Sequence, residues 1–160
     1  MTILMTPRNL ALIAAAGSAA MLLAAWGFQY LGGLAPCAMC IWQRWPHALA
    51  VVSGGLALVT PLAAWLGLGG ALGTAAIGGF HTGVERGWWE GPTSCTSGSI
   101  EGLTTEELLN QIMAAPVVRC DEVPWDLLGL SMASWNMLLS LGFAVLWLLA
   151  IIKMRRPSGT

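Results

Sequence analysis

Four long apolar stretches constrain the fold of this chain more than any other feature. They run from about Leu10 to Leu31, Ile41 to Thr60, Leu62 to Gly83 and Met132 to Ile152. Each is close to the ~20 residues that an α-helix needs to cross a hydrocarbon core of ~30 Å. Backbone groups in lipid must be hydrogen-bonded within their own segment, so we expect four spanning helices. The chain is 9% charged, whereas soluble domains carry about a quarter charged residues, and this indicates a membrane protein.

The connections between these stretches predict a four-helix bundle. Thr60-Pro61 separates the second stretch from the third, because proline and the residue before it both disfavour a continuous helix. The glycine-rich third stretch predicts close contact with a neighbouring helix. The first stretch is either a cleaved signal peptide or a retained span. Its apolar run exceeds the ~7–15 residues of a signal peptide, so we favour the span. We expect one domain, residues 1–160, with an all-α membrane fold.

The charged residues predict which side of the membrane each segment faces. Arg8 precedes the first stretch, and a basic cluster follows the last: Lys153, Arg155 and Arg156. The positive-inside rule then places both termini in the cytoplasm, which requires an even number of spans. All eight acidic residues lie between Glu85 and Asp126, so segments 32–40 and 84–131 are expected to face outward. A net charge of −1 gives no reason to expect nucleic-acid binding.

One helix is predicted inside the long outer segment, about residues 84–131. Thr104 and Glu107 form a capping box, and Leu103 and Leu108 have the spacing of a hydrophobic staple. The helix that starts here would end before Pro116 and carry one apolar side. It lies either on the membrane surface as a tether or against the bundle, and the sequence leaves both placements open.

Two cysteine pairs carry the chemistry of the chain. Cys37 and Cys40 form a CxxC motif beside the second apolar stretch, and such a pair can cycle between dithiol and disulfide. Pro36 suits a helix start, so Cys40 is expected in the first helical turn, where free amide groups favour a thiolate. Cys95 and Cys120 lie in the outer segment, where disulfides persist. They are either a structural staple or an exchange partner of the CxxC pair.

Two polar residues in the apolar stretches, Arg44 and His81, are candidates for ligand binding. Arg44 follows Cys40 by four residues, so both lie on one helix face. Arg44 either reaches lipid phosphates, or supports a Cys40 thiolate and donates to a carbonyl of a quinone, a two-electron acceptor that lives in the bilayer. His81 can hydrogen-bond a second quinone carbonyl or relay a proton. A lone histidine such as His47 is more often packed or hydrogen-bonded than catalytic.

These features resemble the disulfide bond formation protein B (DsbB) family of bacterial thiol:quinone oxidoreductases. Three segments carry the resemblance. Residues 37–44 read CAMCIWQR and match the family pattern C-x-x-C-x-x-x-R. Residues 81–85 read HTGVE and are similar to the family pattern H-x-x-[LV]-[QE]. Residues 125–132 read WDLLGLSM and resemble the stretch that leads into the family's last span. The resemblance implies a multi-pass enzyme of the bacterial inner membrane, with its active site facing the periplasm.

The resemblance also implies an electron route. Cys95 would form a mixed disulfide with a reduced periplasmic, thioredoxin-like partner of the DsbA type. Cys120 would exchange with Cys37, which would leave Cys40 as a thiolate beside ubiquinone or menaquinone. Arg44 would support that thiolate. The implied activity is that of a protein-dithiol:quinone oxidoreductase.

Three other interpretations remain open at this point. The chain could be a non-enzymatic tetraspan protein with two permanent disulfides. It could hold a Cys₄ zinc site, although Cys95 and Cys120 lack the paired spacing usual for zinc ligands. It could also be another quinone-linked thiol oxidoreductase, such as a vitamin K epoxide reductase homologue. That family usually carries its CxxC motif on a later span.

Overall fold

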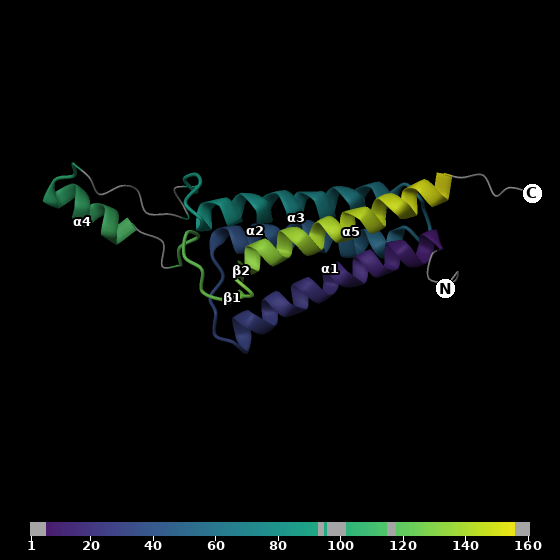
Figure 1. Cartoon of the computed structure of the whole chain (residues 1–160), viewed down its shortest axis with the longest axis horizontal. Coiled ribbons are helices and arrows are strands. Elements are labelled where there is room, and N and C mark those ends of the chain that lie inside the picture. The colour runs from purple at the N-terminus through teal and green to yellow at the C-terminus, as the bar shows by residue number, and fades with distance from the viewer. Residues whose placement is uncertain (1–5, 93–94, 96–101, 115–117, 156–160) are drawn as a thin grey trace, which may run out of the picture.

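The computed structural model of the chain describes residues 6–92, 95, 102–114 and 118–155 (Figure 1). This part of the chain forms α1 (Pro7–Tyr30), α2 (Ala38–Leu56), α3 (Ala63–Glu85), α4 (Thr105–Ala114) and α5 (Met132–Arg155). Three of these helices, α1, α3 and α5, are long and apolar enough to cross a membrane. The protein is thus mostly helical, as expected for an integral membrane protein. Arg156, Pro116 and most of the Gly/Ser-rich segment 93–102 lie outside the described residues.

The helix bounds differ from the predicted ones by a few residues. The largest difference is at the end of α2, which stops at Leu56 rather than at Thr60. Residues 57–62 form turns in which Thr60 N–H donates to the Leu56 carbonyl at 2.9 Å. The chain therefore reverses around Pro61, as the sequence predicts, but the reversal takes more residues than expected.

The four long helices run alongside one another (Figure 1). Helix α3 packs against α2 and α5, and α1 packs against the same two helices from the other side. The beginning of α1 and the end of α5 lie at one end of the bundle, and the beginning of α2 and the end of α3 lie at the other. Helix α1 diverges from α5 toward this second end (Figure 1).

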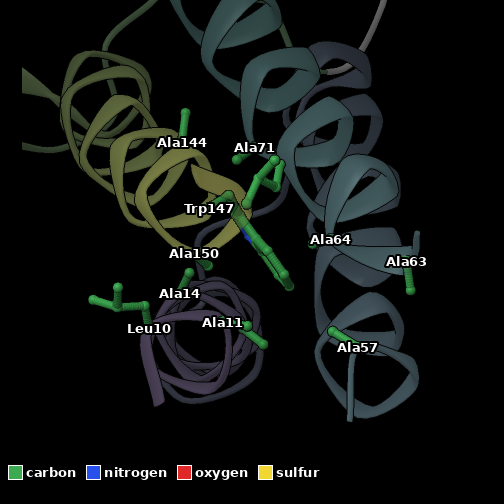
Figure 2. Close-up of a cluster of buried hydrophobic side chains, with 12 residues drawn as sticks. Leu10, Ala11, Ala14, Ala57, Ala63, Ala64, Ala71, Ala144, Trp147 and Ala150 are labelled. Atoms are coloured by element: carbon green, nitrogen blue, oxygen red, sulfur yellow. The ribbon is translucent and has the colours of Figure 1, made fainter. Parts of the chain in front are cut away.

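Small side chains allow the helices to approach closely at the end near the termini. The buried cluster there is mostly alanine, contributed by α1, α3, α5 and the end of α2, and Trp147 of α5 lies at its centre (Figure 2). Within lipid, helices associate through close van der Waals contact rather than through expulsion of water, which favours small residues at the contacts. Trp147 is fully buried and fills the space that the alanines leave.

Gly67 and Gly69 offer a matched test of this packing. A Cβ at Gly67 would overlap the buried indole ring of Trp147, whereas a Cβ at exposed Gly69 meets nothing within 4 Å. We expect Gly67→Ala to lower the free energy of unfolding by about 1–3 kcal/mol through overpacking. Gly69→Ala should raise it by about 0.5–1 kcal/mol or leave it unchanged. Thermal unfolding of both variants in one detergent checks this, and equal effects would contradict the packing around Trp147.

The mostly helical fold also contains one short hairpin that the sequence did not predict. Strands β1 (Asp126–Leu127) and β2 (Leu130–Ser131) form a short antiparallel ladder immediately before α5. The two residues between them, Leu128 and Gly129, both have positive φ, of 55° and 74°. A two-residue turn of this kind matches the twist of the flanking strands. Leucine rarely adopts this conformation, so the sequence did not indicate the hairpin.

Helix α4 begins at the predicted capping box. Thr104 N–H donates to the Glu107 carboxylate at 2.8 Å, and Glu107 N–H lies 3.4 Å from the Thr104 hydroxyl. The hydrogen bond from the Thr104 backbone lowers the pKa of the Glu107 carboxyl. The helix stands away from the bundle, so the structure gives no support to packing against it (Figure 1). Its apolar side chains Leu109, Ile112 and Met113 are exposed.

Candidate functional site

The CxxC pair lies at the beginning of α2, as predicted. Cys37 is the N-cap residue, and its sulfur accepts a hydrogen bond from the backbone N–H of Cys40 at 3.2 Å. The two sulfurs are 2.8 Å apart, and the Cys37 thiol donates to the Cys40 sulfur. Both cysteines are free; Cys37 is buried and Cys40 is half-buried. The helix start therefore holds a dithiol in which the sulfur of Cys40, the more exposed of the two residues, receives a hydrogen bond.

The second pair, Cys95 and Cys120, forms a disulfide with a Cα–Cα distance of 5.2 Å. The Cys120 N–H also donates to the Cys95 carbonyl at 2.8 Å. Both residues are fully buried and pack with Cys37, Met39 and Val84. The outer disulfide thus lies directly against the CxxC pair. Its burial was not expected from the polar segment that contains it.

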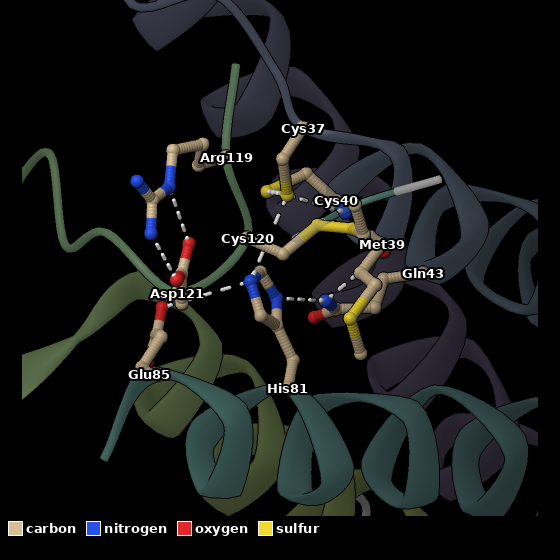
Figure 3. Close-up of a disulfide and its surroundings, with 10 residues drawn as sticks. Cys37, Met39, Cys40, Gln43, His81, Glu85, Arg119, Cys120 and Asp121 are labelled. Carbon is tan, nitrogen blue, oxygen red and sulfur yellow. Dashed lines mark hydrogen bonds and ion pairs between the residues drawn. A yellow bond between two sulfur atoms is a disulfide. The ribbon is translucent and has the colours of Figure 1, made fainter. Parts of the chain in front are cut away.

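His81 lies close to both cysteine pairs (Figure 3). The sulfurs of Cys37 and Cys120 and a ring nitrogen of His81 all lie within 4.8 Å of one another. Nε2 of His81 is 3.6 Å from the Cys37 sulfur and 3.8 Å from a carboxylate oxygen of Glu85. Glu85 in turn accepts a hydrogen bond from the hydroxyl of Ser131, at the end of the hairpin. The structure therefore places His81 against sulfur.

Gln43 and Asn136 were not identified as site residues from the sequence, yet they connect the site to the core. Gln43 Nε2 lies 3.0 Å from Nδ1 of His81, and Gln43 Oε1 accepts from Asn136 Nδ2 at 2.6 Å. Asn136 Oδ1 lies 2.7 Å from Nε2 of His47. The prediction that His47 is hydrogen-bonded is thus confirmed. Buried amides in apolar helices require such partners, and this requirement is the signal that would have identified them.

An ion pair flanks the disulfide on its outer side. The guanidinium of Arg119 donates to both carboxylate oxygens of Asp121, at 2.9 and 2.5 Å. This bidentate hydrogen bonding holds the pKa of the Asp121 carboxyl below its usual range. Cys120 lies between these two residues in the sequence, so the pair restrains the backbone on both sides of it.

A cavity of about 400 Å³ opens beside the CxxC pair where α1 diverges from α5. Its walls are mainly apolar and come from α1, α2, the end of α3, α5 and the segment before the hairpin. Phe28 and Trp125, with ring centroids 5.1 Å apart, form part of them. Cys40 and Arg44, which the sequence predicts on one face of the helix, both line the cavity. Arg44 donates to the side chain of Gln29 at 2.8 Å. Its Nε is buried and has no hydrogen-bond partner among the described residues.

These residues fit a quinone head group. The cavity has the size of a small-molecule site, typically ~300–1,000 Å³, with apolar walls and few polar groups. Arg44 offers N–H donors for a carbonyl oxygen, and Cys40 lines the same cavity. His81 lines this cavity as well as contacting Cys37, so the predicted ligand-binding residues share one cavity.

Comparison with known proteins identifies the family. The sequence model described as "Disulfide bond formation protein DsbB" matches residues 7–150. A protein named disulfide bond formation protein B from Methylococcus capsulatus is 35% identical, with 82% of this chain and 85% of that protein covered. A protein of the same name from Verminephrobacter eiseniae is 32% identical, with 94% of this chain and 88% of that protein covered. Another from Acidovorax sp. is 30% identical, with 92% of this chain and 88% of that protein covered.

The chain belongs to the DsbB family. As a DsbB-family protein it is a disulfide-generating oxidoreductase. This overturns the interpretation of a non-enzymatic protein and decides against the vitamin K epoxide reductase family. The Cys₄ zinc site is also not supported, because two of its four sulfurs are bonded to each other in this DsbB-family chain.

Proposed function

We propose that this DsbB-family chain is a protein-dithiol:quinone oxidoreductase that reoxidises a periplasmic, thioredoxin-like oxidase of the DsbA type. One observation carries the proposal. The CxxC pair lies against the outer disulfide, whose Cys120 sulfur is within 4.8 Å of the Cys37 sulfur, and both of its cysteines line the cavity, so the pair adjoins the sites of both reaction partners that such an enzyme needs. When bound, a quinone supplies an acceptor for two electrons and two protons.

The thiol exchange runs through Cys95, Cys120 and Cys37. A thiolate of the partner attacks the Cys95 sulfur, the Cys95–Cys120 bond breaks, and Cys120 leaves as a thiolate. The Cys120 thiolate then attacks the Cys37 sulfur of an oxidised CxxC pair, and Cys40 leaves as a thiolate. The proximity of the Cys120 and Cys37 sulfurs, within 4.8 Å, supports this order.

The next exchange returns the outer pair to its disulfide. The second thiol of the partner attacks the mixed disulfide between the partner and Cys95, so that the partner disulfide forms and Cys95 leaves as a thiolate. The Cys95 thiolate then attacks the Cys120 sulfur in the Cys120–Cys37 bond, and Cys37 leaves. The Cys95–Cys120 disulfide forms again and the CxxC pair is left as a dithiol. This is the combination present in the structure, an outer disulfide beside two free CxxC thiols. The dithiol then gives up two electrons and two protons as the Cys37–Cys40 bond re-forms.

Burial of the outer disulfide sets a requirement on the first step. Cys95 is fully buried, so a partner thiolate reaches it only after the segment carrying Cys95 has separated from the bundle. Breaking the sulfur–sulfur bond also removes the covalent link between the two cysteines, which are then held by buried packing and by the hydrogen bond from the Cys120 N–H to the Cys95 carbonyl. We therefore propose that binding of the partner and exposure of Cys95 occur together.

The proposed orientation has both termini in the cytoplasm of a bacterial cell and the cysteines at the periplasmic side of the inner membrane. Basic residues at the beginning of α1 and the end of α5 support it: Arg8, Lys153 and Arg155. Helix α2 is proposed as the fourth span because it lies alongside three helices of spanning length. The exposed apolar side chains of α4 support its placement on the membrane surface.

Quinone withdrawal tests the proposed function. The purified protein in lipid nanodiscs is mixed with a reduced thioredoxin-like dithiol, with and without a short-chain ubiquinone, and free thiols are counted by alkylation and mass spectrometry. We expect thiols of the chain to accumulate only when quinone is absent. With quinone, partner disulfide and quinol should form in equal amounts. Cysteines that stay oxidised under both conditions would contradict the proposal.

A further inference from the structure

The hydrogen bonds of Gln43 determine which ring nitrogen of His81 carries the proton (Figure 3). Gln43 Nε2 lies 3.2 Å from the backbone carbonyl of Met39, which can only accept, so this end of the amide is the NH₂ group. This NH₂ group faces Nδ1 of His81 at 3.0 Å, so Nδ1 is the acceptor of the ring. The proton of neutral His81 is therefore on Nε2.

Asn136 fixes the other end of the Gln43 amide. Its Nδ2 lies 3.3 Å from the backbone carbonyl of Thr74, again an acceptor only, and donates to Gln43 Oε1 at 2.6 Å. A reversed Gln43 amide would place two acceptors together at Met39 and two donors together at Asn136. Buried polar groups seldom lose their hydrogen bonds, so the orientation of Gln43 is determined twice.

The same contact opposes a proton relay through His81. To accept a proton from a thiol at Nε2, the neutral ring must carry its own proton on Nδ1; as an imidazolium it carries protons on both nitrogens. Each of these forms directs an N–H at the NH₂ group of Gln43, 3.0 Å away. His81 is therefore a neutral ring with a fixed donor at Nε2.

This donor lies at the point of thiol exchange. Nε2 is 3.6 Å from the Cys37 sulfur, a hydrogen-bonding contact, and a ring nitrogen lies within 4.8 Å of both the Cys37 and Cys120 sulfurs. The Cys120 backbone also hydrogen-bonds the ring, whereas the Glu85 carboxylate, at 3.8 Å from Nε2, is beyond hydrogen-bond distance. The Cys37 sulfur also accepts from the Cys40 N–H at 3.2 Å. Two N–H donors thus serve the sulfur of Cys37.

We propose that Gln43 is a positioning residue that fixes His81 as a hydrogen-bond donor to the Cys37 sulfur. This inference rests on the exchange between Cys120 and Cys37 in the proposed function. When the Cys95 thiolate attacks Cys120, the Cys120–Cys37 bond breaks and its electron pair goes to the Cys37 sulfur. The His81 N–H stabilises this leaving thiolate and keeps its own proton. The proton that later converts the thiolate to a thiol is one that the partner's thiols released.

Nitrogen-15 spectra of the histidine rings test the tautomer in the native chain in lipid nanodiscs. The chain has two histidines, so the signals missing from His81→Gln are those of His81. We expect Nδ1 to be unprotonated and Nε2 protonated, and Gln43→Leu to give a mixture of tautomers. The matched control is Ser140→Ala, because Ser140 joins the same network through Asn136 Oδ1 at 3.4 Å, and it should keep the native tautomer. A protonated Nδ1 in the native chain would overturn the inference.

The disulfide partner of Cys120 measures the effect on Cys37. In a Cys40→Ser background, Cys37 and Cys95 compete for the sulfur of Cys120. The equilibrium ratio of Cys37–Cys120 to Cys95–Cys120 disulfide then reports how well the free Cys37 sulfur is stabilised. Acid quenching, alkylation and peptide mapping measure this ratio without quinone or partner.

Two substitutions of His81 separate a donor from a proton relay in this background. We expect His81→Leu to raise the ratio about 3- to 10-fold, the effect of one hydrogen bond, and Gln43→Leu to raise it less. His81→Gln offers an amide N–H but cannot relay a proton, so it should keep the ratio within about twofold. A relay changes rates and not equilibria, so it predicts no change in any of these variants.

An unchanged ratio in His81→Leu, or an equal rise in His81→Leu and His81→Gln, would overturn the role of His81 and leave the proposed function standing. Cysteines that stay oxidised in the quinone-withdrawal experiment would instead overturn the function, and with it the step that His81 serves, even where the ring has the expected tautomer.

Discussion

Cys40→Ser is expected to stop quinone-dependent oxidation of a partner dithiol, leaving only the rate without enzyme. A serine hydroxyl cannot form or break a disulfide, so the CxxC pair can no longer release an electron pair beside the cavity. The Cys37 thiolate of this variant can attack Cys120 in the outer disulfide, with Cys95 leaving as a thiolate, because the Cys37 and Cys120 sulfurs lie within 4.8 Å. We therefore expect a detectable fraction of Cys37–Cys120 disulfide. Quinone absorbance measures the first effect, and peptide mapping under non-reducing conditions measures the second.

Cys120→Ser is the matched control for this prediction. It removes the exchange with the protein partner but leaves the CxxC pair beside the cavity intact. We expect it to retain quinone reduction by a small dithiol that reaches the CxxC pair directly, and to lose reduction by the protein partner. Turnover of the protein partner by Cys40→Ser at the wild-type rate would contradict the proposed electron route.

Much of the fold follows from apolar length alone. The sequence predicted helices that match α1, α2, α3 and α5 within a few residues, because the cost of unpaired backbone in lipid leaves few alternatives. The capping box at Thr104 located α4 to within one residue, since it is a short-range hydrogen-bonding pattern. Local rules of this kind can be read from sequence without knowledge of the tertiary structure.

The hairpin and the polar network could not be predicted in this way. Leu128 and Gly129 turn the chain where leucine is unfavourable, and this turn is held by tertiary context rather than by local preference. Gln43 and Asn136 are 93 positions apart, and their hydrogen bond exists only because α2 and α5 both pack against α3. Pairing between distant polar residues depends on helix rotation, which apolar length does not determine.

The candidate site was predicted in composition but only partly in arrangement. The positions of Cys40 and Arg44 on one face of α2 follow from their spacing, and both line the cavity. His81 was expected to face a quinone carbonyl, but the structure also places it against the sulfur of Cys37. The burial of the outer disulfide could not be derived from the sequence, because it results from packing between separate segments.

Arg44→Gln is expected to raise KM for quinone about 10- to 100-fold, the effect of losing hydrogen bonds from a charged donor. KM for the partner dithiol should stay within about twofold, because Arg44 lines the cavity and not the surface around Cys95. Steady-state kinetics with each substrate varied in turn separate the two constants. Gln29→Leu should have a smaller effect of the same kind, since it removes only the acceptor that holds the guanidinium.

A matched control separates this site from the general attraction of arginine for lipid phosphates. Arg86 follows α3 directly and lies against the ring of Trp88, away from the cavity wall. If Arg44 acts through the cavity, Arg86→Gln leaves KM for quinone unchanged, and Arg44→Lys restores only part of the affinity because an ammonium group lacks the planar fork of donors. Equal effects of Arg44→Gln and Arg86→Gln would show instead that Arg44 reaches lipid headgroups, the other interpretation that its position in the sequence allows.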